Sequence, residues 1–156
     1  MTARPALSLD DRRFLEAAIE QARQGAAEGG VPIGAALVVD GRVLGAGRNQ
    51  RVQRGSVIRH GETDALENAG RQPAAVYARS TMYTTLSPCH MCSGAILLYG
   101  IPRVVVGENR TFLGAEDLLR SRGVEVVNAD AGPCVSLMEG FIREHPDLWH
   151  EDIGQE

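Results

Sequence analysis

Two short segments carry metal-binding residue types, and together they restrict which parts of the chain must meet in the fold. The first is His60-Gly61-Glu62 and the second is Pro88-Cys89-His90-Met91-Cys92. Both stand where a helix is expected to begin. Cys89 and Cys92 are three residues apart on a first helical turn, so both sulfur atoms can face one ion. His60 can supply a third ligand from a facing helix, which requires the two helix starts to lie together.

One imidazole and two thiolates suit Zn²⁺ and leave a fourth position open to water. A helix N-terminus also favours the thiolate form, which the metal requires. Glu62 is placed to stand beside the ion without binding it, where a carboxylate can move protons between water, a substrate nitrogen and a leaving amine. H-x-E with P-C-x-x-C is the known signature of zinc-dependent deaminases. We predict one Zn²⁺ per chain, bound by His60, Cys89 and Cys92, with Glu62 as the catalytic residue.

Simpler interpretations exist for each of these residues. A structural zinc site could use Cys134 as its fourth ligand, and Glu62 could be an ordinary first-turn carboxylate favoured by the helix dipole. We interpret His90 as a surface or interface residue and Cys134 as a buried, small apolar residue. The pairing of both motifs in one chain favours catalysis, because a structural site has no use for Glu62.

Charge and composition argue against several classes of partner. The net charge is −4, the pI is about 5.6, the arginines are scattered and the C-terminal end is acidic, which disfavours a nucleic-acid substrate. Three cysteines with a C-x-x-C pair do not indicate a disulfide framework. No signal peptide is visible, and the apolar run over 94–99 is too short to span a bilayer. We expect a cytoplasmic protein with one domain over 1–156 and no membrane partner.

Hydrophobic periodicity and turn residues divide the chain into helices and strands. Ser8 with Asp11 resembles a capping box, and Asp40-Gly41 is a hairpin turn signal. Alternation of strand and helix in the later half favours parallel pairing there. The predicted fold is α/β, a three-layer α/β/α sandwich around a mixed sheet of about five strands. The predicted strands are 33–39, 43–47, 81–86, 103–107 and 124–127; the predicted helices are 8–28, 60–70, 88–99, 115–122, 135–144 and one from 146 onward, with a loop over 50–58.

Beyond the metal motifs, the chain resembles the fungal-type cytosine deaminases nearly from end to end. The resemblance implies a cytidine deaminase-like fold, conversion of free cytosine to uracil and ammonia, and a homodimer through the apolar stretch 93–99. The terminal tryptophan and acidic tail are more specific than the metal motif. The segments that carry the resemblance are 28–34 (EGGVPIG), 60–62 (HGE), 66–68 (LEN), 83–89 (YTTLSPC), 99–103 (YGIPR), 106–109 (VGEN), Trp149 and 151–154 (EDIG).

The resemblance also implies contacts to the substrate. Asn49 would bind the pyrimidine carbonyl oxygen and an adjacent ring N–H, since a carboxamide both donates and accepts. The Gly61 N–H would help to hold that oxygen. The Ser87 carbonyl and the Asp152 carboxylate would receive the amino group. Without the resemblance, the simpler interpretation of Asn49 is a turn residue after its strand.

Two aromatic residues are expected to wall the flat ring, Phe112 and Trp149. Pro146 begins a terminal helix on which Trp149 and Asp152, three residues apart, share one side. A small base offers few atoms for binding, so its pocket must enclose it, and we predict that this helix closes over the site. The alternatives are a helix packed on the sheet with Trp149 in the core, and Phe112 as a core residue.

The sequence also departs from the fungal pattern near the site. Arg48 stands where those enzymes have His, His90 replaces an acidic residue, and Thr63 and Asp64 replace an apolar residue and Ser. Other readings therefore stay open: a deaminase of guanine, creatinine or a modified pyrimidine, or a zinc-stabilised binding module without catalysis. A tRNA adenosine deaminase usually has Ala between His and Glu and a basic C-terminal helix, so Gly61 and the acidic tail disfavour it.

Overall fold

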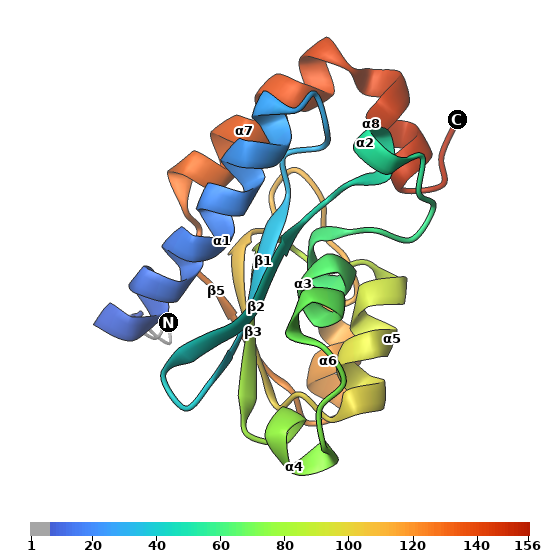
Figure 1. Cartoon of the computed structure of the whole chain (residues 1–156). Coiled ribbons are helices and arrows are strands. Elements are labelled where there is room, and N and C mark those ends of the chain that lie inside the picture. The colour runs from blue at the N-terminus through green and yellow to red at the C-terminus, as the bar shows by residue number, and fades with distance from the viewer. Residues whose placement is uncertain (1–6) are drawn as a thin grey trace.

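The computed structural model describes residues 7–156 as a five-stranded sheet with helices on both faces (Figure 1). The strands are β1 (Gly34–Val39), β2 (Arg42–Arg48), β3 (Ser80–Leu86), β4 (Arg103–Glu108) and β5 (Glu125–Asn128). The helices are α1 (Leu9–Ala27), α2 (Arg51–Arg54), α3 (Gly61–Ala69), α4 (Ala74–Tyr77), α5 (His90–Tyr99), α6 (Glu116–Ser121), α7 (Gly132–Glu144) and α8 (Pro146–Asp152).

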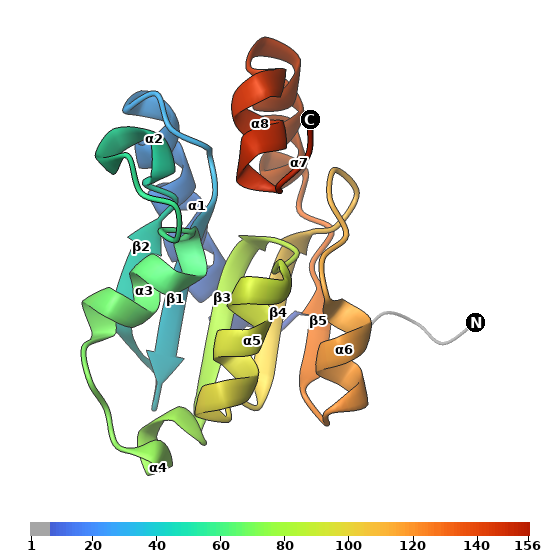
Figure 2. The ribbon, with the colours of Figure 1, turned by 90° about the vertical axis from the view of Figure 1, so that its right-hand side faces the viewer.

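The sheet is mixed, with the strand order β2-β1-β3-β4-β5. β1 pairs antiparallel with β2 and β3, whereas the β3–β4 and β4–β5 pairs are parallel. The predicted α/β class, the strand number and the parallel later half are confirmed. Figure 2 shows α8 beyond the edge where β3 and β4 end. The carboxyl ends of parallel strands are the usual place for a ligand in such a fold.

Each face of the sheet has its own apolar core. Along β1, Leu37 contributes to the core beneath α3, α5 and α6, while Val38 contributes to the core beneath α1 and α7. This alternation follows from the period of two along a strand. The two faces are visible in Figure 1, where α1 and α7 lie on one side of the sheet and α3, α5 and α6 on the other.

The helix that carries the H-x-E motif lies unusually close to β2. A Cβ atom on Gly47 would overlap the backbone nitrogen of Ala65, and one on Gly45 would overlap that of Ala69. Only glycine therefore permits α3 to pack at this distance. The close packing fixes the start of α3, and with it His60, against the sheet.

Local signals place most boundaries correctly. Ser8 and Asp11 form the predicted capping box, with Asp11 N donating to Ser8 Oγ at 3.0 Å. Asp40 and Gly41 both have positive φ angles, 51° and 75°, as a type I′ hairpin turn requires. The region 50–58, predicted as loop, contains the short helix α2, and α4 was not predicted.

Three further boundaries differ from the prediction. α5 begins at His90 with Cys89 as its N-cap, instead of beginning at Pro88. α7 begins at Gly132, three residues early, and β5 is shifted by one residue. Within the described residues, no helix combines the length and apolarity that a membrane span needs.

Candidate functional site

The two helix starts predicted to meet do so at the carboxyl edge of the sheet. His60 is the N-cap of α3 and Cys89 is the N-cap of α5, with Cys92 on the first turn of α5. His60 Nδ1 lies 3.5 Å from Cys89 Sγ and 3.6 Å from Cys92 Sγ. All three ligand atoms lie within 4.8 Å of one another. The three residues thus form one ligand cluster.

The spacing of this cluster fits zinc. Tetrahedral zinc with Zn–N near 2.0–2.1 Å and Zn–S near 2.3 Å separates nitrogen from sulfur by about 3.6 Å. The two nitrogen–sulfur distances match this value. The predicted ligand set is therefore brought together, and three protein ligands leave one position of a tetrahedron open, as in catalytic zinc sites.

The cysteine at the start of α5 is prepared to be a thiolate. A hydrogen bond from the Cys92 thiol, followed by one from His60, lowers the pKa of the Cys89 thiol to about 4, against the opposing effect of burial. A thiolate is the form that binds a metal.

Glu62 stands beside this cluster and is almost fully buried, with 3% of its surface exposed. The Thr84 hydroxyl hydrogen-bonds to Glu62 Oε1, and Thr84 Oγ1 also lies 3.1 Å from the Leu86 carbonyl oxygen. Burial raises the pKa of the Glu62 carboxyl. A carboxyl group with a raised pKa is suited to accept and return a proton near neutral pH. Thr84 belongs to the segment 83–89, which carries the resemblance to cytosine deaminases, but no motif marks Thr84 itself as a site residue.

A small cavity of about 20 Å³ lies beside the cluster. His60, Glu62 and Cys89 line it together with four of the predicted substrate residues, Ser87, Phe112, Trp149 and Asp152. The cavity is also lined by three apolar residues, Ile33, Leu86 and Ile153. They were not predicted as site residues, because no sequence motif distinguishes them from ordinary apolar residues.

Phe112 and Trp149 meet edge to face across this cavity. Their ring centroids are 5.7 Å apart and their planes are at 86°. Trp149 also packs in an apolar cluster with Met138 and Phe141 of α7. Trp149 therefore lines the cavity and also packs on α7. The two alternatives for the terminal helix, a cover over the site and a helix packed in the core, describe the same placement.

The other two predicted contacts, Asn49 and Gly61, are not among the residues lining the cavity. Asn49 is fully buried, and its Nδ2 donates to Asp152 Oδ1 at 2.9 Å. Gly61 packs against the Gly34 backbone, which a Cβ atom would approach to 3.2 Å. The structure thus joins Asn49 to the site through Asp152.

The carboxylate of Asp152 connects α8 to the rest of the site. Asp152 Oδ2 lies 3.7 Å from His60 Nε2, and Asp152 Oδ1 lies 3.3 Å from Arg51 Nε. Arg51 Nη2 also lies 3.3 Å from Glu151 Oε1. Burial raises the pKa of Asp152. Arg51, which no sequence motif marked, therefore ties α8 to α2 over about a hundred residues of sequence.

The remaining cysteine lies elsewhere. Cys134 belongs to the core between the sheet and α1, on the face opposite α3 and α5. Burial raises the pKa of its thiol to about 12. It is the predicted small buried residue and lies outside the ligand cluster, which argues against a structural zinc site with Cys134 as the fourth ligand. His90 is exposed, as predicted.

Comparison with known proteins agrees with this geometry. Residues 8–108 match the cytidine and deoxycytidylate deaminase zinc-binding region. A cytosine deaminase of Candida albicans is 54% identical over 150 residues, which cover 96% of this chain and 100% of that protein. A tRNA-specific adenosine deaminase of Streptococcus pyogenes is 32% identical over 141 residues, 84% of this chain and 89% of that protein.

Solved structures share the fold. A structure from a study of tRNA:A34 deaminases has a TM-score of 0.68 and 26% identity, covering 81% of this chain and 99% of its own. A structure solved in complex with 2,6-diaminopurine has a TM-score of 0.69 and 20% identity, covering 92% and 87%. With His60, Cys89 and Cys92 at zinc-binding distances, the chain belongs to the cytidine and deoxycytidylate deaminase zinc-binding family and is a zinc-dependent deaminase.

Proposed function

We propose that this protein hydrolyses free cytosine to uracil and ammonia. The observation that carries the proposal is that Phe112, Trp149 and Asp152 line one small cavity together with the metal ligands His60 and Cys89 and with Glu62. Aromatic side chains and a carboxylate beside the ligand cluster suit a small flat base that carries an amino group, and we expect the cover formed by α8 to exclude an attached ribose or nucleic-acid strand. The end-to-end identity with a cytosine deaminase of Candida albicans supports the same substrate.

Glu62 is the proton carrier in this proposal. When bound, zinc supplies a water molecule of lowered pKa, near 7, which can attack at neutral pH. As the water oxygen bonds to C4, Glu62 takes one water proton and delivers it to the ring nitrogen N3; it then takes the proton of the new C4 hydroxyl group and gives it to the exocyclic amine. The C4–N bond breaks, a C4 carbonyl forms, and ammonia leaves. The Thr84 hydroxyl donates to one carboxylate oxygen of Glu62 and so holds the carboxylate in place.

The substrate is oriented by groups from three separate segments. Asn49 and the Gly61 N–H bind the carbonyl oxygen, and Asp152 with the Ser87 carbonyl receives the amino group. The hydrogen bond from Asn49 to Asp152 supports this arrangement, because it holds the two polar ends of the binding site at a fixed separation. Phe112 and Trp149 exclude water from both edges of the ring, which strengthens the polar contacts inside.

The cavity of about 20 Å³ shares five of its lining residues with a more open hollow of about 400 Å³. We expect the Phe112 loop or α8 to move as substrate enters from this hollow and as product leaves. Motions of this kind limit turnover in many enzymes.

A homodimer through α5 is the second part of the proposal. Leu98 and Tyr99 on α5 expose 75% and 44% of their surface, and Met91 exposes 38%. Beside them lies a groove of about 680 Å³ lined by residues of α3, α4 and α5. Exposed apolar side chains beside a groove favour contact with a second copy of the chain. Sedimentation of the parent and of Leu98→Glu tests this: a dimer is expected to become a monomer.

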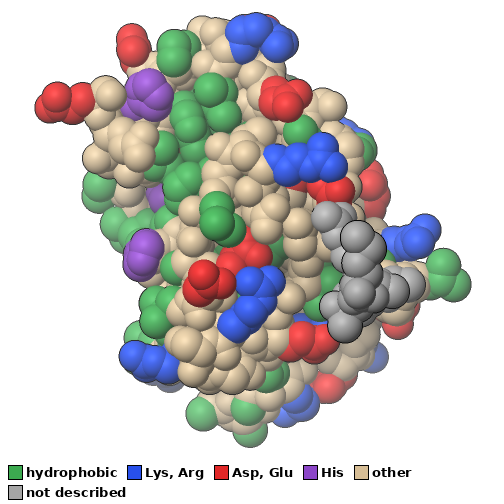
Figure 3. All heavy atoms as spheres, turned by 180° about the vertical axis from the view of Figure 1, so that it is seen from behind, with side chains coloured by type: hydrophobic (Ala, Val, Ile, Leu, Met, Phe, Trp, Pro, Cys, Tyr) green, Lys and Arg blue, Asp and Glu red, His purple; other side chains and the backbone are tan. Residues whose placement is uncertain are grey.

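A nucleic-acid substrate receives less support. On the face shown in Figure 3, arginine side chains lie among acidic ones without forming a continuous basic surface. The net charge of −4 points the same way.

The test is ammonia release by the purified protein with matched panels of substrates. Cytosine should be deaminated, whereas cytidine, tRNA, guanine and creatinine should release little ammonia. Faster turnover of any of these four than of cytosine would contradict the proposal. Zinc bound without turnover of any of the five would instead indicate a binding module.

A further inference from the structure

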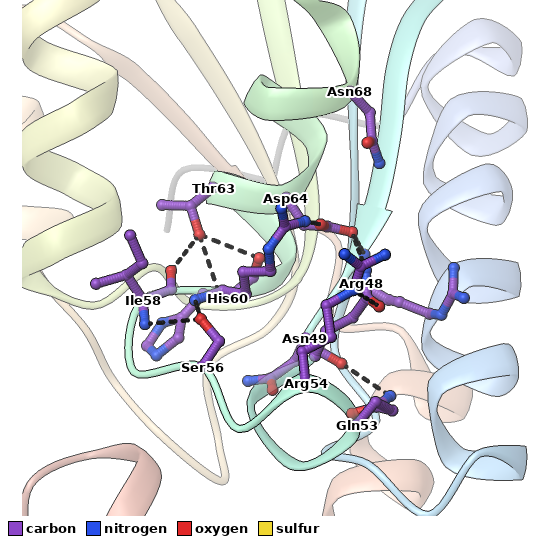
Figure 4. A network of polar contacts seen from close by, with 12 residues as sticks. Arg48, Asn49, Gln53, Arg54, Ser56, Ile58, His60, Thr63, Asp64 and Asn68 are labelled. Carbon is purple, nitrogen blue, oxygen red and sulfur yellow. Dashed lines mark hydrogen bonds and ion pairs between the residues drawn. The ribbon is translucent and has the colours of Figure 1, made fainter.

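One chain segment carries both a metal ligand and a proposed substrate contact. Residues 49–60 leave the end of β2 with Asn49, form α2, and return to His60 at the start of α3. Figure 4 shows this segment closing on itself beside the first turn of α3. The relative position of Asn49 and His60 therefore depends on what holds the two ends of the segment together.

A single carboxylate on α3 holds them. The Asp64 side chain is fully buried and accepts three hydrogen bonds. Arg48 N donates to Asp64 Oδ2 at 3.0 Å (Figure 4). Gln50 Nε2 donates to the same oxygen at 3.0 Å, and Arg59 Nη1 donates to Asp64 Oδ1 at 2.7 Å. Asp64 thus contacts the residues on both sides of Asn49 and the residue immediately before His60.

The segment adds one direct tie between its own ends. Gln50 N donates to the Arg59 carbonyl oxygen at 3.0 Å. With Gln50 bound both to Arg59 and to Asp64, the backbone on the far side of Asn49 has little freedom. Asn49 N itself donates to the Ile33 carbonyl oxygen at 2.9 Å.

The neighbouring Thr63 serves the other end of the segment. His60 N donates to Thr63 Oγ1 at 2.9 Å, and Thr63 Oγ1 donates to the Ile58 carbonyl oxygen at 2.6 Å. The first turn of α3 therefore holds the segment by two sets of hydrogen bonds. Asp64 accepts from the residues on either side of Asn49 and from Arg59, while Thr63 accepts from the backbone N–H of the metal ligand His60.

We propose that Asp64 is a positioning residue that sets the place of Asn49 relative to the metal site, and that Thr63 does the same for His60. The substrate part of this inference rests on the proposed function, because it takes Asn49 as a substrate contact. Asp64 touches neither substrate nor ligand atoms. It acts through the backbone of Arg48 and the side chains of Gln50 and Arg59. The Ser of the fungal pattern at this position would not accept the same set of hydrogen bonds.

A purely structural role is the rival explanation, and the chain provides a matched control for it. Asp11 is also a buried aspartate, 6% exposed, and pairs with Arg103 at 2.7 Å. It lies on α1, which packs on the face of the sheet opposite α3. Asp11→Ala should lower the melting temperature and leave the kinetics of the site unchanged.

The experiment compares Asp64→Ala, Thr63→Val and Asp11→Ala below their melting temperatures. Displacement of a positioned group costs up to about 10²-fold, so Asp64→Ala should lower kcat/KM for cytosine by roughly 10- to 100-fold, mainly through KM. Its zinc release to a chromogenic chelator should stay near the parental rate. Thr63→Val should show the opposite pattern, with faster zinc release and a smaller change in KM.

Hydrogen exchange supplies an outcome that does not depend on the substrate. Asp64→Ala should speed amide exchange at Arg48 and across 49–59, and Asp11→Ala should not. If the parent does not deaminate cytosine, the proposed function fails, while this exchange arm still decides the inference. Parental exchange across 49–59 in Asp64→Ala, or parental kcat/KM on an active parent, overturns it.

A variant that does not fold leaves the test intact. Asp64→Asn keeps one acceptor oxygen and the side-chain shape, so it should fold and lose part of the set. Its expected rise in KM is about threefold or more, the effect of one ordinary hydrogen bond. Asp64→Asn with parental KM and parental exchange across 49–59 would likewise overturn the proposal.

Discussion

The metal side of the site and its cover come from different parts of the chain. The metal ligands His60, Cys89 and Cys92 lie within one turn of the start of α3 or α5, whereas Trp149 and Asp152 line the cavity beside them from α8, near the C-terminus. The metal side is fixed by helix caps, close glycine packing and buried hydrogen bonds. The covering side is fixed by apolar packing on α7 and by the ion pairs of Arg51. The metal ligands thus lie at helix starts that pack against the sheet, whereas the cover is held by side-chain packing and ion pairs.

Loss of a metal ligand tests this division most severely. Cys92→Ala should remove zinc and reduce deamination to background, since a catalytic zinc site with two remaining ligands binds metal weakly. Cys134→Ala is the control, because Cys134 lies in the opposite core. Metal analysis should find one zinc per chain in the parent and in Cys134→Ala. Zinc loss in Cys134→Ala at unchanged folding would contradict the three-ligand site.

Removal of the proton carrier should separate chemistry from metal binding. Glu62→Gln preserves shape and can still hydrogen-bond to Thr84, but it cannot carry protons. We expect kcat to fall by at least the ~10²–10⁴-fold typical of a general acid–base group. Zinc content should equal that of the parent. More than about a tenth of the parental rate, a loss far short of that range, would mean that another group moves the protons.

Changes on the covering side should reduce activity without removing the metal. Asp152→Ala should lower kcat/KM for cytosine by roughly 10- to 100-fold, as expected for a hydrogen bond to a charged group. Deletion of 147–156 should lower kcat/KM at least as much. Both variants should retain zinc. A folded, zinc-loaded variant of either kind with parental kcat/KM would show that α8 is not a functional lid.

The smallest effect on activity is expected away from both sides of the site. Hydrogen bonding to Arg103 is the main cause that lowers the pKa of Asp11 below its ordinary 3.8. The pair therefore stabilises the fold above that value, and the contribution is lost as the pH falls toward the lower folded-state pKa. Asp11→Asn should lower the melting temperature at pH 7, and the difference from the parent should shrink below about pH 4.

The control for this prediction is kinetic. Asp11→Asn should keep kcat/KM within about twofold of the parent, because additive behaviour is usual for distant sites. A melting-temperature difference that grows as the pH falls would contradict the assigned direction of the pKa shift.

The sequence by itself determined the elements and the metal chemistry. The capping box at Ser8, the turn at Asp40-Gly41 and the period-two strands are local patterns whose energetics depend on neighbouring residues. His60, Glu62, Cys89 and Cys92 were identifiable because catalytic zinc requires particular atoms at particular spacings. The short helices α2 and α4 were missed because elements of four residues have too little periodicity to detect.

Only the tertiary structure decided how the site is closed and braced. Arg51 forms an ion pair with Asp152, and Thr84 hydrogen-bonds to Glu62. Asp64 accepts hydrogen bonds from the neighbours of Asn49. No sequence motif connects the residues that these contacts join. Ion pairs and buried hydrogen bonds depend on distances across the folded chain, and a sequence pattern contains no information about these distances. A short motif names the reacting groups, whereas the packing of distant segments sets where those groups stand.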